Sequence, residues 1–202
     1  MAEQGILIVL SGPSGAGKGT ICKELLRSNP EINYSISATT RTPREGEKHG
    51  VNYWFVSRAE FQEMIDQDQL LEWAEVYGNY YGTPCQRITE LLNTGKDVVL
   101  EIDTQGATQI KNKFPKGVCI YIVPPSLDEL AKRIHKRGTD SLENIKTRLN
   151  CANDELTYVH NYHYVVVNDE VQNATKKVTA IIMAEKCRVT RNLSMIEHIL
   201  TK

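Results

Sequence analysis

The sequence lacks three features: a long hydrophobic run, an excess of one charge, and paired cysteines. The apolar run Ile6–Leu10 is too short for a membrane span or a signal peptide, and no basic segment precedes it. A formal net charge of −1 at pH 7 gives no reason to expect a nucleic-acid or membrane surface. The five cysteines are odd in number and widely spaced, which argues against a disulfide framework or a zinc site. We therefore expect a cytoplasmic protein with reduced thiols that binds neither nucleic acid nor membrane.

Internal repeats, low-complexity segments and a Ser–His–Asp or Cys–His pattern are absent as well. His160 and His163 lie three residues apart, but no second ligand pair with zinc spacing accompanies them, so we interpret both as structural. A missing general base is compatible with a reaction whose acceptor is a phosphate, because such an acceptor is already anionic.

The composition is that of an ordinary globular chain, with 41% hydrophobic and 24% charged residues among 202. This length allows one well-buried core with appended lobes, or at most two small domains. Apolar, β-branched runs alternate with helical patterns, which predicts an α/β core with a parallel sheet. The predicted strands are Ile6–Leu10, Val98–Ile102, Val118–Val123 and Tyr164–Val167. The predicted helices are Lys18–Arg27, Pro84–Asn93 (with proline in the first helical position), Gln105–Lys113, and Leu127–Arg137 after a capping box at Ser126.

Two segments break this alternation. Residues 38–82 hold two aromatic, β-branched stretches and a helix capped by Ser57, which predict an inserted lobe of short strands with one helix. Residues 133–148 are dense in charge and contain Gly138, a pattern typical of a mobile lid. Apolar residues at helical spacing beyond Val171 predict a helix or helix pair that packs against the core rather than binding a partner. The predicted division is a core of residues 1–37, 83–132 and 149–202, a lobe of residues 38–82 and a lid of residues 133–148.

The segment after the first predicted strand carries the strongest functional signal. GPSGAGKGT stands between a buried strand and a helix, the context that a phosphate-binding P-loop requires. Glycines let the backbone curl so that N–H groups point at a polyphosphate, and the helix N-terminus and Lys18 add positive charge. Gly19 stands where a Mg²⁺-binding serine or threonine is usual. The predicted cradle is Gly12, Pro13, Ser14, Gly15, Ala16, Gly17, Lys18, Gly19 and Thr20.

The predicted lobe contains groups suited to a guanine nucleotide. Arg41 and Arg44 flank a proline, which suits a rigid turn presenting two guanidinium groups to one phosphate; two solvated surface arginines are the alternative. Glu72 can accept from two neighbouring N–H donors, and guanine offers that pair as N1–H and N2–H₂. Adenine would leave Glu72 facing an acceptor, which costs affinity. A hydroxyl of Ser37 or Thr83 could donate to guanine O6, and a tyrosine of the lobe could bond the phosphate.

Charged residues near the predicted strand ends complete the candidate site. Glu101 and Asp103 end a buried strand, where acidic residues face the ligand crevice of a parallel sheet and can hold Mg²⁺ or its waters. Arginines of the predicted lid could close over a phosphoryl group and stabilise its charge, although a charge run is more often a solvated helix face. These arginines are Arg133, Arg137 and Arg148.

Together these motifs resemble those of the guanylate kinases. The matching stretches include GPSGAGKGT, SATTRTPREGEKHGVNYWF, LLEWAEVYGNYYGTP, LEIDTQG, KRIHKRGTD and VVVND, in the family's order from about Ile6 to about Glu185. The resemblance implies a P-loop kinase with a three-layer core, a GMP-binding lobe and a lid. It also implies transfer of the γ-phosphoryl of Mg·ATP to GMP, with dGMP as a further acceptor, giving ADP and GDP in purine nucleotide metabolism. Whether the protein is a monomer or a homo-oligomer is left open.

The resemblance implies a role for each matching residue. The phosphate of GMP would be held by Arg41, Arg44, Tyr53 and Tyr81, and guanine would be read by Ser37, Glu72 and Thr83. Asp103 would lie near the acceptor with Glu101 beside it, each able to reach Mg²⁺ through water but neither a direct ligand. The catalytic cations would be Lys18, Arg41, Arg133, Arg137 and Arg148, and the adenine ring would be met by Asn168 and Asp169.

Three positions depart from the family pattern: Thr83, Glu101 and Gly19 stand where serine, aspartate and serine are frequent. Gly19 removes a direct Mg²⁺ ligand, so the ion would be held mainly by ATP oxygens and water. Three alternatives remain at this point. Glu72 argues against the first alternative, a kinase for another monophosphate such as AMP. Lys18 and the lid arginines argue against the second alternative, a non-enzymatic guanylate-kinase-like module that binds protein partners. The absence of an N-K-x-D motif after the core strands opposes a regulatory GTPase.

Overall fold

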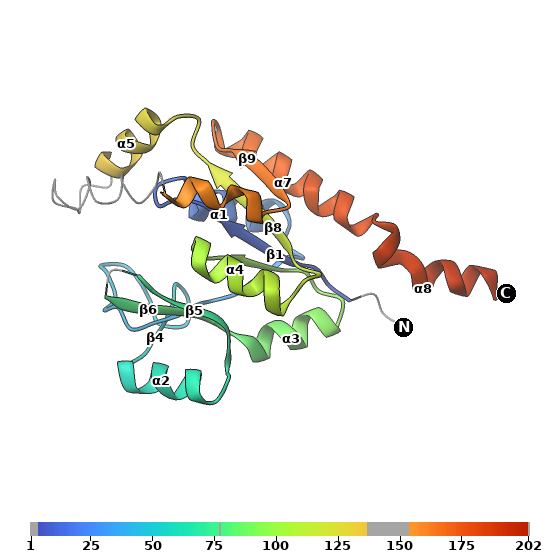
Figure 1. Ribbon diagram of the computed structural model, residues 1–202, viewed down its shortest axis with the longest axis horizontal. Coiled ribbons are helices and arrows are strands. Elements are labelled where there is room, and N and C mark those ends of the chain that lie inside the picture. The colour runs from blue at the N-terminus through green and yellow to red at the C-terminus, as the bar shows by residue number, and fades with distance from the viewer. Residues whose placement is uncertain (1–3, 77, 137–153, 202) are drawn as a thin grey trace.

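The computed structural model describes residues 4–76, 78–136 and 154–201 (Figure 1). Its centre is a five-stranded sheet with the order β2-β7-β1-β8-β9, in which every neighbouring pair is parallel. The predicted α/β core with a parallel sheet is therefore confirmed. The strands are β1 (Leu7–Ser11), β2 (Asn33–Tyr34), β7 (Val98–Glu101), β8 (Val118–Val123) and β9 (Tyr164–Val167). Strand β2 was not predicted, because two half-buried residues make no apolar run.

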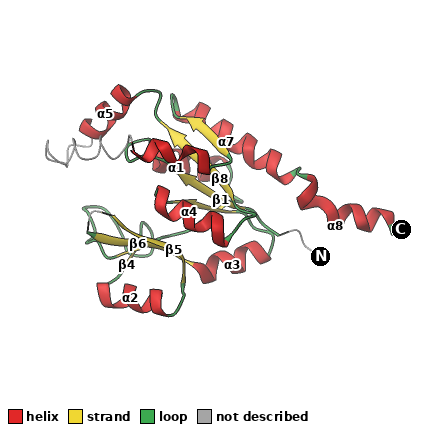
Figure 2. Cartoon of the chain, in the orientation of Figure 1, coloured by secondary structure: helices red, strands yellow, loops and turns green. Residues whose placement is uncertain are grey.

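Helices cover both faces of this sheet (Figure 2). Alternate residues of the first strand serve the two faces, since Ile8 and Leu10 belong to one apolar cluster and Leu7 and Val9 to the other. Helices α1 (Lys18–Ser28) and α7 (Val171–Lys186) close the first cluster, while α3 (Cys85–Asn93) and α4 (Thr104–Lys113) close the second. The result is the three-layer architecture expected of a P-loop kinase.

A second, smaller sheet is inserted between β2 and α3. Its order is β4-β3-β6-β5, with β3 parallel to β4 and antiparallel to β6. Helix α2 (Arg58–Asp66) begins at a full capping box of Ser57 and Glu60, and its Phe61 packs on Ala38 and Leu70. The strands are β3 (Ala38–Thr39), β4 (Trp54–Phe55), β5 (Leu70–Val76) and β6 (Asn79–Pro84). This mixed α+β lobe agrees with the expectation for residues 38–82, and the exact boundaries of core, lobe and lid stay predictions.

Two helix starts and one helix cap differ from the sequence expectations. The predicted first-turn Pro84 instead ends β6 and precedes α3, with extended backbone at φ −60° and ψ 130°. Helix α4 begins one residue before the predicted Gln105, because the Asp103 carboxylate accepts from the Gly106 N–H at 2.7 Å and caps the helix. At α5 (Leu127–Lys136) only half of the predicted capping box forms. The Ser126 hydroxyl accepts from the Glu129 N–H at 3.1 Å, while the Glu129 carboxylate pairs with Arg133.

The C-terminal part is two helices, α7 and α8 (Val189–Leu200), of which only α7 packs on the core. Every residue of α8 has a described position and none is buried; Leu193 and Ile196 are exposed. The expectation of core packing is thus right for α7 and wrong for α8, because apolar periodicity marks a face without saying what covers it.

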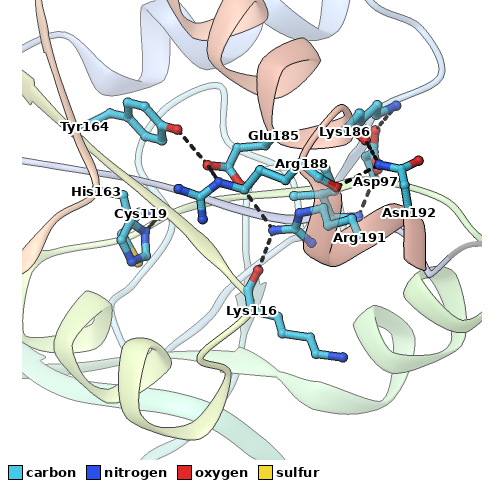
Figure 3. A network of polar contacts seen from close by, with 11 residues as sticks. Asp97, Lys116, Cys119, His163, Tyr164, Glu185, Lys186, Arg188, Arg191 and Asn192 are labelled. Atoms are coloured by element: carbon cyan, nitrogen blue, oxygen red, sulfur yellow. Dashed lines mark hydrogen bonds and ion pairs between the residues drawn. The ribbon is translucent and has the colours of Figure 1, made fainter. Parts of the chain in front are cut away.

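An ion network around the buried Glu185 fixes the junction between α7 and α8 (Figure 3). The Glu185 side chain accepts from the Tyr164 hydroxyl at 2.6 Å and pairs with Arg188 at 3.3 Å and Arg191 at 3.4 Å. Because Tyr164 belongs to β9, this carboxylate ties both helices to the edge of the sheet. A short 3₁₀ helix, η1 (Thr157–Asn161), precedes β9. Within the described residues, no helix combines the length and the apolar character needed to cross a membrane.

Candidate active site

The GPSGAGKGT loop joins β1 to α1 at the carboxyl edge of the central sheet. Gly12 and Gly17 have φ angles of 139° and 91°, in the left-handed region that favours glycine. A side chain at Gly12 would also clash with the backbone of Ile122 on β8. The Lys18 ammonium lies over the loop and donates to the carbonyls of Gly12 at 2.5 Å and Pro13 at 3.3 Å. The loop therefore has the compact, curled shape that suits a phosphate.

One cavity of about 320 Å³ joins this loop to the smaller sheet. Most residues predicted to bind either nucleotide lie on its wall, including residues from both sheets. The predicted site residues that line it are Gly12, Ser14, Gly15, Gly17, Lys18, Gly19, Ser37, Arg44, Tyr53, Glu72, Tyr81, Glu101 and Asp103. The cavity brings together side chains that are far apart in the sequence, because β5 packs beside α4, the helix that follows the carboxyl end of β7.

Glu72 is the buried acid of this cavity. Its side chain is 4% exposed, and the Thr83 hydroxyl, opposite it on β6, donates a short hydrogen bond to Oε1. Burial raises the pKa of the Glu72 carboxyl to about 7, with the Thr83 bond acting against the shift and the charge of Asp103 adding to it. The carboxylate rests directly on Gly106 of α4, since a Cβ added there would come within 3.0 Å of Oε2. Gly106 thus provides the space that this carboxylate occupies.

The arginine turn is organised by Glu47, a residue that the sequence expectations did not include. Both carboxylate oxygens of Glu47 lie 3.0 Å from Nη2 of Arg41, and Oε2 also accepts from the Arg44 N–H at 2.8 Å. The Arg41 guanidinium lies over the Tyr53 ring, 5.5 Å from its centroid. Arg44 lines the cavity with Tyr53 and Tyr81, whereas Arg41 is not among the lining residues and packs on the Tyr53 ring. The two arginines therefore flank the cavity without both reaching into it.

Glu101 faces the first turn of α1. A Cβ added at Gly19 would lie 3.1 Å from one Glu101 carboxylate oxygen and 3.2 Å from the other. The glycine therefore leaves room for the longer acid at the point where the usual serine would stand. Across the described part of the chain, no group of three or more histidine, cysteine or acidic side chains is arranged to hold a metal ion.

Asn168 braces the phosphate loop from the other side. Its side-chain nitrogen donates to the Ala16 carbonyl at 2.7 Å, and its backbone carbonyl accepts from the Arg133 guanidinium at 3.1 Å. Among the described residues its side-chain oxygen Oδ1 is buried and has no hydrogen-bond partner. Asp169, the neighbouring prediction, is exposed. An unpartnered buried acceptor is unfavourable by itself and suits a ligand with an N–H donor.

The predicted lid arginines are placed only in part. Arg133 lies on α5, where its side chain pairs with Glu129 at 2.8 Å. Arg137 and Arg148 lie outside the described residues, as does most of the predicted lid.

Glu155 lines the same cavity and was not predicted from the sequence. Its Oε2 atom accepts from the Ser14 N–H at 3.3 Å, and the Tyr121 hydroxyl donates to its backbone carbonyl at 2.6 Å. Ser14 and Glu155 are 141 positions apart, so only the folded chain brings them together.

Comparisons with known proteins agree with this geometry. The family model described as guanylate kinase matches residues 4–185. A curated guanylate kinase from Desulfitobacterium hafniense (strain Y51) is 62% identical over 189 residues, covering 94% of each chain. Another, from Caldanaerobacter subterraneus subsp. tengcongensis, is 58% identical over 190 residues, covering 94% of this chain and 92% of its own. The crystal structure of guanylate kinase from Anaplasma phagocytophilum is similar at a TM-score of 0.80, with 33% identity over 95% of this chain and 91% of that one. With its phosphate loop, its inserted lobe and these relatives over nearly its whole length, the chain belongs to the guanylate kinase family.

Proposed function

We propose that this chain is a cytoplasmic enzyme that transfers the γ-phosphoryl of ATP to GMP. The observation that carries the proposal is the single cavity that the phosphate loop shares with Glu72 and Arg44. A phosphate cradle and a guanine-reading acid on one cavity allow two nucleotides to bind with their phosphates toward each other. Membership of the guanylate kinase family supports the same reaction.

Glu72 and its neighbours would determine which nucleotide binds as the phosphoryl acceptor. Above its pKa of about 7 the Glu72 carboxylate can accept from both N1–H and N2–H of guanine. Thr83 orients this carboxylate through the bond to Oε1, and the Ser37 hydroxyl on the cavity wall can donate to O6. Arg44 and Tyr81 line the end of the cavity where the phosphate of GMP would lie. We assign Arg41 a supporting role, because Glu47 and Tyr53 already engage its guanidinium.

ATP fits the opposite end of the cavity. The loop from Gly12 to Thr20 would hold its phosphates, with Lys18 reaching the terminal ones. The family resemblance assigns the adenine ring to Asn168, whose side-chain nitrogen donates to the Ala16 carbonyl of the loop and whose buried Oδ1 has no partner among the described residues. Glu101 and Asp103 would reach a nucleotide-bound Mg²⁺ through water, and that ion supplies charge neutralisation on the phosphates.

The chain's own contribution to the chemistry is positioning and charge. An anionic phosphate oxygen of GMP attacks the γ-phosphorus in line, and ADP leaves, so no residue has to remove a proton. Holding the two reactants in this geometry accounts for about 7–11 kcal/mol of the barrier in well-oriented systems. Lys18 and Arg133 supply positive charge from the described residues, and Arg137 and Arg148 stay predictions from the family resemblance.

A coupled ADP-release assay with Mg·ATP and each of GMP, dGMP, AMP, CMP and UMP tests the proposal. We expect turnover with GMP and dGMP and little with the others. Equal or faster turnover of AMP would refute the role of Glu72, and it would favour a kinase for another monophosphate. No turnover with any acceptor would favour a guanylate-kinase-like binding module.

A further inference from the structure

Glu155 places a carboxylate in the phosphate loop. Its Oε2 atom lies 3.3 Å from the backbone nitrogen of Ser14, inside the loop that the proposed function reserves for ATP. A backbone N–H of a phosphate loop is a donor for an anion. This donor therefore has an acceptor in a side chain of the same chain.

The backbone of Glu155 is held independently of its side chain. The Tyr121 hydroxyl on β8 donates to the Glu155 carbonyl at 2.6 Å, and the Tyr121 side chain is fully buried. Tyr121 also packs against Tyr162, with ring centroids 4.6 Å apart. The main chain at Glu155 is thus anchored to β8 by a bond that does not involve the carboxylate, whose position depends on the side-chain torsions.

The charges around Glu155 explain why the carboxylate rests there and why it can be displaced. Burial raises the pKa of its carboxyl, the positive charge of Lys18 and the Ser14 N–H lower it, and Asp103 on the far wall raises it again. Lys18 is the residue that reaches the terminal phosphates of a bound nucleotide. Lys18 and the Ser14 N–H therefore both attract the Glu155 carboxylate toward the loop that would hold the phosphates.

We propose that Glu155, whose carboxylate lies at the Ser14 N–H of the phosphate loop, is a positioning residue that selects the magnesium complex of ATP over the metal-free nucleotide. The inference rests on the proposed function. Free ATP carries its full negative charge toward Glu155, whereas magnesium neutralises part of that charge. The carboxylate therefore opposes metal-free ATP more strongly than Mg·ATP. The negative charge is required in this role, because an uncharged side chain would not distinguish the two forms.

Calorimetric titration of ATP without GMP, once with Mg²⁺ and once with a chelator, tests this selection without any turnover. In the wild-type protein we expect metal-free ATP to bind at least about tenfold more weakly than Mg·ATP. In Glu155→Gln the Kd of metal-free ATP should fall about tenfold, while the Kd of Mg·ATP changes less than about threefold. Glu155→Ala should change both Kd values in the same direction as Glu155→Gln.

Asp154→Asn is the matched control, because Asp154 is an exposed acid one position earlier whose backbone carbonyl, not its carboxylate, accepts from Thr157. It should bind both forms of ATP as the wild type does. Unchanged or weaker binding of metal-free ATP by Glu155→Gln would overturn the proposal, as would equal wild-type affinities for the two forms, a result that needs no variant. Wild-type turnover of GMP is measured separately, so a failure of this inference leaves the proposed function standing.

Discussion

In Glu72→Gln the buried carboxylate becomes a neutral amide of nearly the same shape, and Thr83 can still donate to its oxygen. The wild-type side chain is 4% exposed, and burial raises the pKa of its carboxyl from 4.5 to about 7. In the unfolded chain the same group is solvated and ionises near its ordinary pKa. The charged form is therefore less favourable in the folded, nucleotide-free protein than in the unfolded chain.

The size of this effect follows from the pKa difference. Each pKa unit corresponds to about 1.4 kcal/mol, so the ionised carboxylate costs the folded state about 3 kcal/mol at pH 8. Because the folded pKa is the higher one, the stability contributed by the bound proton is complete below pH 4.5 and lost as pH rises through about 7. Glu72→Gln should consequently unfold with a free energy about 3 kcal/mol above wild type near pH 8 and less than about 1 kcal/mol above it near pH 5.

Urea unfolding at both pH values, without nucleotide, measures the difference. Glu75→Gln is the control, since Glu75 is an exposed acid on the same strand, and it should leave the free energy of unfolding within about 0.5 kcal/mol of wild type. The same Glu72→Gln protein should lose about 10- to 100-fold in GMP affinity, because a charged acceptor for two N–H donors is gone. A variant that is less stable than wild type near pH 8, or whose gain does not depend on pH, would refute the reasoning.

Three further predictions concern the same cavity. Gly106→Ala should raise the KM for GMP about tenfold and leave the Kd of ATP unchanged, because the added Cβ displaces Oε2 of Glu72. Steady-state kinetics measures the KM and titration measures the Kd, and an effect on ATP binding alone would contradict this prediction. GMP binding to the wild type should weaken about tenfold from pH 8 to pH 6 as Glu72 takes up a proton; Glu72→Gln corrects for titration of the nucleotide phosphate, and an equal loss in both proteins would speak against Glu72. Lys18→Met should reduce kcat by about 10³-fold or more while its circular dichroism spectrum stays that of wild type, and near-normal turnover would remove Lys18 from the phosphate site.

The parts of the site that the sequence predicted best are those built from neighbouring residues. The loop from Gly12 to Thr20 needs a fixed local spacing after a strand, so residues of one short segment are enough to predict its shape. Glu72 and Thr83 were predicted one by one, and the hairpin of β5 and β6 brings them together because their strands are antiparallel. Their shared hydrogen bond, and the space left by Gly106, could not be read from spacing.

Features that depend on distant parts of the chain escaped prediction. Glu155 meets Ser14 across 141 positions, and nothing in its sequence neighbourhood distinguishes it from an ordinary surface acid. Glu47 organises the arginine turn through side-chain geometry that the residue order alone does not specify. The prediction that α8 packs against the core was wrong, because apolar periodicity shows which face of a helix is apolar but not what that face contacts.

The central claim is that one cavity brings ATP and GMP together for direct phosphoryl transfer, and label transfer tests it most directly. ATP radiolabelled at its γ-phosphate is mixed with equal concentrations of GMP and AMP, and the labelled products are separated after a single turnover. We predict that the label appears in GDP, at least about a hundredfold over labelled ADP, because adenine leaves Glu72 without donors. Label in ADP at a comparable level, or label released only as inorganic phosphate, would contradict the account.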